Sequence, residues 1–87
     1  ELFVKSLVCD RMNYMAMEEI REGEVLTGKI RYNHPGAPCT LKKLEHGRVQ
    51  VDFLEPQRAV TPGQAVVLYQ GEYVAGGGII LGPVKEN

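Results

Sequence analysis

The sequence lacks the segments that mark membrane and secreted proteins. No apolar run approaches the roughly 20 residues that a membrane-spanning helix requires. The chain opens with ELFVKSLV, which has neither the basic leading segment nor the small-residue cleavage site of a signal peptide. There are only two cysteines, Cys9 and Cys39, and no CxxC pair. We therefore expect two buried free thiols in a reducing compartment, rather than a disulfide-stabilised secreted domain.

Recognisable catalytic motifs are also missing. The chain has no P-loop, no GxSxG and no HExxH sequence. A nucleophile–base pair of Cys39 with His34 or His46 is conceivable chemically, but no motif places these residues together. A zinc site made by Cys9, Cys39, His34 and His46 lacks the usual ligand spacing. We expect no catalytic residue and no metal site in this chain.

Charge is nearly balanced over the whole sequence but not along it. With 10 Lys/Arg against 11 Asp/Glu, the net charge of -1 argues against a strongly basic nucleic-acid binder. Residues 1–28 have three basic and six acidic side chains, whereas residues 29–58 have six basic and three acidic ones. The basic middle third is either one face that attracts a polyanion or ordinary solvated strand surface, and the charges alone do not decide between them.

Turn signals at short intervals separate segments rich in β-branched and aromatic residues, which predicts a small all-β sandwich or barrel forming a single domain over residues 1–87. A short helical turn is expected near residues 14–21, where MAMEE provides good helix formers and Gly23 follows. The expected strands cover residues 2–8, 25–32, 39–44, 48–54 and 65–69, with a final stretch from 73 to 81 across the Gly76–Gly78 run.

Alternation within these segments predicts which side chains share a face. From 48 to 54, Val49, Val51 and Phe53 fall on one face of the strand. Residues 65–69 do not alternate, so we expect both of their faces to be covered.

Several Lys and Arg side chains fall on different predicted strands and loops. Alternation places Lys29 and Arg31 on one face of the second strand, and Arg48 on the outward face of the fourth. Arg58 follows in an expected loop between Pro56 and Pro62, whose fixed φ angles would lower the entropy lost when the loop is ordered. Such an Arg suits bidentate phosphate or carboxylate contact. The alternative is that Gln57 and Arg58 satisfy loop carbonyls and help to close the barrel.

Two long segments resemble a known family. KIRYNHPGAPCTL (29–41) and GRVQVDFLEPQRAVTPGQAVVLYQGEYVAGGGII (47–80) are similar to the C-terminal domain of tRNA-specific 2-thiouridylases, the tRNA-uridine 2-sulfurtransferases. The resemblance implies a six-stranded β-barrel like domain II of translation elongation factors. It also implies that the chain is the C-terminal fragment of a larger cytoplasmic enzyme, whose other domains use ATP, and two cysteines absent here, to thiolate the wobble uridine.

The implied role of the barrel itself is non-catalytic and requires no cofactor. Its expected partners are tRNA and the N-terminal and central domains of the same enzyme, and the parent enzyme would also receive sulfur from a sulfur-carrier protein. The expected RNA-binding residues are Lys29, Arg31, Arg48, Gln57 and Arg58. Two alternatives remain: a structural module that packs against the other domains without touching RNA, and an independent thiol enzyme that uses Cys39.

Overall fold

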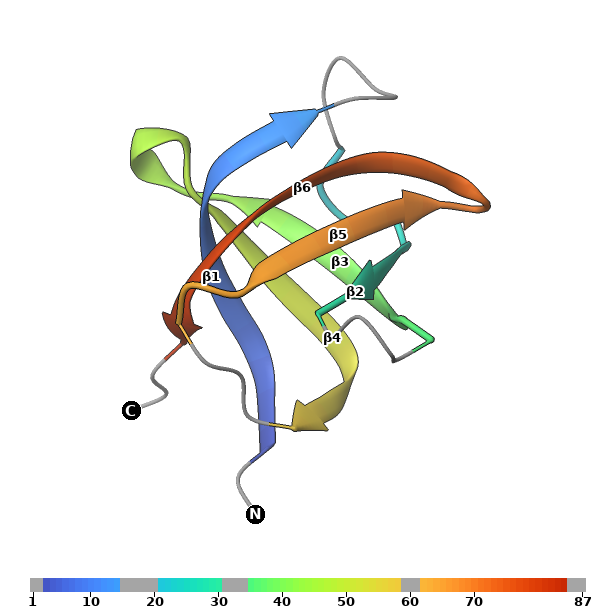
Figure 1. The fold of residues 1–87 in the computed structure, drawn as a ribbon, viewed down its shortest axis with the longest axis horizontal. Helices are drawn as coiled ribbons and strands as arrows, with labels where there is room; N and C mark the ends of the chain where they lie inside the picture. The colour runs from blue at the N-terminus through green and yellow to red at the C-terminus, as the bar shows by residue number, and fades with distance from the viewer. Residues whose placement is uncertain (1–2, 15–20, 31–34, 59–61, 85–87) are drawn as a thin grey trace.

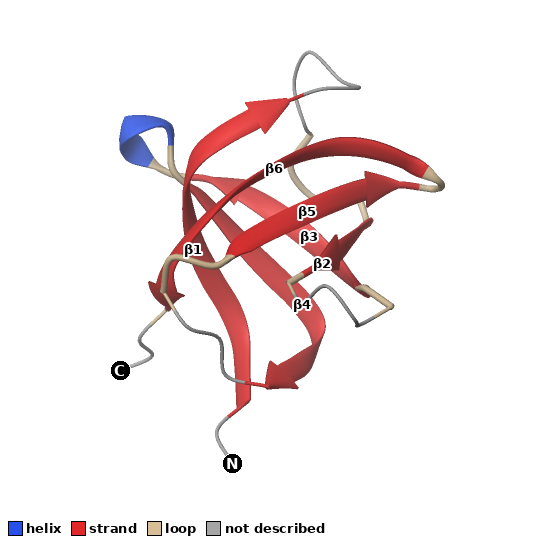
Figure 2. Cartoon of the chain, in the orientation of Figure 1, coloured by secondary structure: helices blue, strands red, loops and turns tan. Residues whose placement is uncertain are grey.

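The computed structural model describes residues 3–14, 21–30, 35–58 and 62–84. Most of these residues belong to β-strands (Figure 2). A single 3-10 turn, η1 (Glu45–Gly47), separates the third strand from the fourth. The strands are β1 (Phe3–Tyr14), β2 (Leu26–Lys29), β3 (Ala37–Lys43), β4 (Val49–Arg58), β5 (Ala65–Gln70) and β6 (Tyr73–Pro83).

The six strands form a closed barrel in the order β1-β4-β3-β2-β5-β6, and every neighbouring pair is antiparallel (Figure 1). The prediction of a six-stranded all-β barrel is confirmed. Tyr14 is the last residue of β1, and residues 15–20, where the helical turn was expected, lie outside the described residues. Within the described ranges, no helix is long or apolar enough to cross a membrane.

The barrel interior is filled by side chains that alternate along the strands, as a small barrel requires. On β4, Val49, Val51 and Phe53 are buried and the residues between them are not, as predicted. The expectation for the fifth strand was wrong: Val66 and Leu68 are fully buried, but Val67 and Tyr69 on the opposite face are only partly so. The buried cluster is Leu7, Cys9, Leu26, Cys39, Leu41, Val49, Val51, Phe53, Val66, Leu68 and Ile80.

The glycine run lies within one continuous strand, β6, which pairs with β5 on one side and with β1 on the other. A Cβ atom added at Gly77 would lie 2.7 Å from the Val66 carbonyl oxygen, and one at Gly78 would lie 2.8 Å from the Asp10 carbonyl oxygen. Both contacts are with backbone, which cannot move aside cheaply. The glycines therefore allow β6 to pass closely between the two strands that it joins to close the barrel.

β4 is longer than the sequence indicated, because the EPQR segment is strand rather than loop. β4 pairs with β3 only as far as Cys39↔Phe53, and with β1 its register jumps from Ser6↔Asp52 to Val4↔Gln57. Pro56 lies within that jump, where its missing N–H breaks no ladder hydrogen bond. Arg58, expected in a loop, is instead the last residue of β4 and pairs with Phe3.

Candidate nucleic-acid interface

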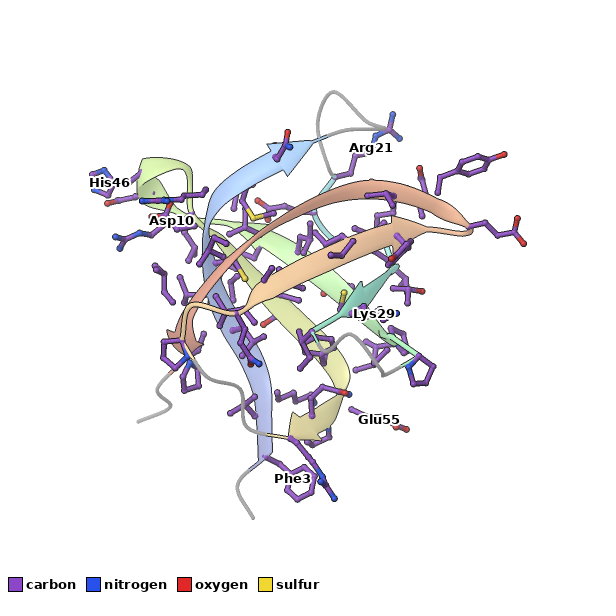
Figure 3. All side chains as sticks on the ribbon, in the orientation of Figure 1. Phe3, Asp10, Arg21, Lys29, His46 and Glu55 are labelled. Atoms are coloured by element: carbon purple, nitrogen blue, oxygen red, sulfur yellow. The ribbon has the colours of Figure 1, made fainter. Side chains whose placement is uncertain are left out.

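One end of the barrel contains a hollow of about 280 Å³, which we call the mouth pocket. It lies at the start of β1 and at the ends of β4 and β2, so its lining residues come from three separate parts of the sequence. Figure 3 shows Phe3 at this end, beside the end of β4. The lining residues are Phe3, Gly28, Ile30, Pro35, Gly36, Pro56, Gln57 and Arg58.

Gln57 and Arg58, both predicted to bind RNA, line this pocket. The Gln57 side chain is half-buried, and its Nε2 donates a hydrogen bond to the Glu55 carbonyl oxygen at 3.0 Å. Gln57 thus satisfies a backbone carbonyl, as one of the two sequence interpretations proposed. The same bond orients its amide, while the Arg58 side chain at the strand end is exposed.

Lys29 lies beside the pocket rather than in it. Gly28 and Ile30 line the pocket, so alternation along the chain directs Lys29 to the outer wall, where its Cα pairs with that of Val67. Lys29 is half-buried there. Arg31 lies outside the described residues.

Arg48 lies at the opposite end of the barrel from Arg58. It follows η1 directly, at the start of β4, and Arg58 ends that strand. Ten residues of extended chain span on the order of 30 Å, comparable with the 35 Å longest dimension of the molecule. In Figure 3, His46, which lies in η1, and Phe3 lie at opposite ends of the molecule. Lys29, Gln57 and Arg58 therefore lie towards one end, and Arg48 at the other.

The carboxylate of Asp52 is held on the wall of the barrel between these two ends. It accepts a hydrogen bond from the Ser6 hydroxyl at 2.6 Å and another from the Gln50 Nε2 at 2.8 Å. Both of these donors are neutral, one a hydroxyl and the other a side-chain amide. The Ser6 bond also links β1 to β4 just before the register jump.

The two thiols are buried and unpaired, as predicted. Burial raises the pKa of Cys9 to about 11. Burial raises the pKa of Cys39 to about 12, with smaller contributions from Cys9 and Asp52. A protonated thiol inside the barrel is a poor nucleophile, which argues against Cys39 as a catalytic residue. Among the described residues, His, Cys, Asp and Glu form no group of three or more that could hold a metal ion.

The pocket also contains residues that sequence reasoning did not select. Phe3 is the most prominent of these, because the residue is 58% exposed and lines the pocket. Ile30, Pro35 and Pro56 add apolar surface. Only the β1–β4 register brings Phe3 next to Arg58, and no local pattern in the sequence encodes that pairing.

Comparison with protein families first gives the class of the domain. Residues 4–80 match the family described as the aminomethyltransferase beta-barrel domain. The chain belongs to this family of small barrel domains.

Comparison with curated proteins then gives the particular relatives, all named tRNA-specific 2-thiouridylase MnmA. The protein from Lachnoclostridium phytofermentans is 48% identical over 93% of this chain and 23% of its own length. Those from Halothermothrix orenii and Koribacter versatilis are 41% and 46% identical, over 100% and 92% of this chain and 23% and 22% of their own lengths. The chain thus spans less than a quarter of these relatives, and its resemblance to the C-terminal domain of the 2-thiouridylases is confirmed.

Proposed function

We propose that this barrel is the non-catalytic RNA-contacting domain of a tRNA 2-thiouridylase and that its mouth end faces the tRNA. The observation that carries the proposal is the mouth pocket, where Gln57 and Arg58 meet the end of β2 and where none of the described lining residues is Asp or Glu. An Arg on a strand end offers a planar set of donors to phosphate oxygens. Lys29 adds a second positive charge from the neighbouring wall.

The parent enzyme in this proposal uses ATP to activate the wobble uridine of tRNA in the cytoplasm, and accepts sulfur from a carrier protein. Those steps belong to parts of the enzyme other than the barrel. The family description names aminomethyl transfer, but the relatives, at 40–48% identity over nearly the whole barrel, are named for thiolation. We therefore propose that the parent enzyme is a thiolating one. A barrel that lacks catalytic residues takes its role from the enzyme of which it is a part.

A second function, packing against the other domains, is favoured by the outer surface of β5 and β6. Tyr73, Val74 and Leu81 are 75%, 38% and 41% exposed there. A shallow hollow of about 290 Å³ with mostly apolar walls lies over the same strands and includes Val67, Val74 and Ile79. This surface is distinct from the mouth pocket, so the two functions are compatible.

The proposal is tested by removing one charge at each end of the barrel in the full-length enzyme. Each lost phosphate contact lowers the slope of log K against log salt concentration by about 0.9. For Arg58→Gln, the ratio of wild-type to variant tRNA affinity should therefore shrink roughly 3.5-fold between 50 and 200 mM salt. Arg48→Gln, which removes the same charge at the opposite end, should leave that slope closer to the wild-type value.

Melting temperatures of the same two variants separate the candidate functions. Unchanged melting with a reduced salt slope for Arg58→Gln supports RNA contact. A lower melting temperature with unchanged tRNA affinity would instead make Arg58 a structural residue, and equal slopes for all three proteins would contradict the proposed orientation.

A further inference from the structure

We infer that the mouth pocket binds a single unpaired nucleotide of RNA, an assignment that rests on the proposed function and adds a specific ligand to it. The first reason is size. At about 280 Å³ the hollow is at the lower limit of small-molecule sites, which run from about 300 to 1,000 Å³. An RNA duplex is far too wide to enter it, whereas one nucleotide turned out of a strand is of the right order.

The second reason is the chemistry of the lining. Ile30, Pro35 and Pro56 supply apolar surface, and Phe3, which also lines the pocket, is 58% exposed. An exposed aromatic ring beside an apolar floor is the usual platform on which an unpaired base stacks. In a barrel whose other Phe, Phe53, is 1% exposed, an exposed Phe beside a hollow is distinctive.

The third reason is the placement of polar groups. A glutamine amide both donates and accepts hydrogen bonds, as the edge of a base requires. The Gln57 amide is oriented by its 3.0 Å bond to the Glu55 carbonyl, so less side-chain entropy is lost on binding. Arg58 follows it on the same strand and lines the same pocket. The geometry thus provides a ring for the base, an amide for its edge and a guanidinium for its phosphate.

The occupant is RNA rather than a protein segment because, in the described part of the lining, the polar side chains are a guanidinium and an amide and none is a carboxylate. The relatives also act in tRNA thiolation, as their names state. A protein segment from another domain remains a distinct outcome of the test.

The test uses the 87-residue chain with three RNA probes: a single-stranded oligonucleotide, the same strand in a duplex, and the same strand with abasic positions. The variants are Phe3→Ala and Phe3→Tyr. Because Phe3 is largely exposed, neither substitution opens the core. Stacking of a base on an aromatic ring is worth about 1–3 kcal/mol, so Phe3→Ala should weaken binding of the single strand roughly 5- to 160-fold. Phe3→Tyr should bind the single strand as tightly as the wild type does. The affinities for the duplex and abasic probes should be the same for the wild type and both variants.

Failure of this inference differs from failure of the proposed function. Salt-dependent binding of the single strand and duplex that is insensitive to Phe3→Ala would overturn the nucleotide pocket but leave RNA contact intact. No binding of any probe by the wild-type chain would overturn both. If Phe3→Ala lowers the melting temperature of the full-length enzyme without changing its tRNA affinity, a protein segment occupies the pocket and the inference is wrong.

Discussion

The stability of the barrel should fall as pH rises from 8 to 10, because its two core thiols resist ionisation. Both Cys9 and Cys39 are fully buried, with pKa values raised from 9.0 to about 11 and about 12. Above pH 9 the unfolded chain loses these protons while the folded chain retains them. Deprotonation of the thiols then stabilises the unfolded state but not the folded one. The stability that depends on protonated thiols is therefore complete below pH 9 and is lost as pH rises toward 11 and 12.

The magnitude follows from the same shifts. Each pH unit between the unfolded and folded pKa values costs about 1.4 kcal/mol per thiol. Between pH 8 and pH 10 the loss is a little over 1 kcal/mol for each thiol, or about 2–3 kcal/mol for the pair. For a domain of this size that is a large part of its total stability.

Urea unfolding of the 87-residue chain at pH 7, 8, 9 and 10, followed by circular dichroism, measures this dependence. Cys39→Ala is the control: the cavity it leaves lowers stability at every pH, but the loss between pH 8 and 10 should be about half that of the wild type. A second measurement is the rate at which a thiol reagent labels the native chain at pH 8, which should be limited by unfolding. Rapid labelling, or stability that does not change between pH 8 and 10, would refute the burial of these thiols.

Two further substitutions test how the barrel is closed. Gly77→Ala should lower the free energy of unfolding by about 1–3 kcal/mol, because the new Cβ would lie 2.7 Å from the Val66 carbonyl oxygen; urea unfolding with wild-type stability would show that β6 does not approach β5 this closely. Ser6→Ala should cost about 1–2 kcal/mol in the same assay, since it removes the 2.6 Å hydrogen bond to the Asp52 carboxylate. A cost near zero for Ser6→Ala would mean that water replaces the hydroxyl.

The sequence predicted the elements whose signals are local. Val49, Val51 and Phe53 alternate with polar residues, so the buried face of β4 could be read directly. β5 could not, because an unbroken apolar run looks the same whether its outer face is covered or exposed. Val67 and Tyr69 lie on that outer face, and the sequence of the strand does not indicate whether another surface covers them.

The candidate site was harder to predict because it depends on register. Arg48 and Arg58 look equivalent in sequence, and the length of β4 alone places them at opposite ends of the barrel. Pro56 suggested a loop, since a proline normally ends a central strand. The strand continues through it because β3 has already stopped pairing, and this depends on residues far away in the chain. Phe3 belongs to the candidate site only because β1 pairs with β4 in the register that places Phe3 opposite Arg58.

Site-specific crosslinking to tRNA tests most directly whether the mouth end faces the RNA. Glu55 and Glu45 are both exposed acidic residues, one in β4 near the mouth pocket and the other in η1 at the opposite end. A photo-crosslinking amino acid is placed at one or the other position in the full-length enzyme, which is then irradiated with bound tRNA. Crosslinks from position 55 and few or none from position 45 are the expected result. Crosslinks from position 45 alone would contradict the proposed orientation of the barrel.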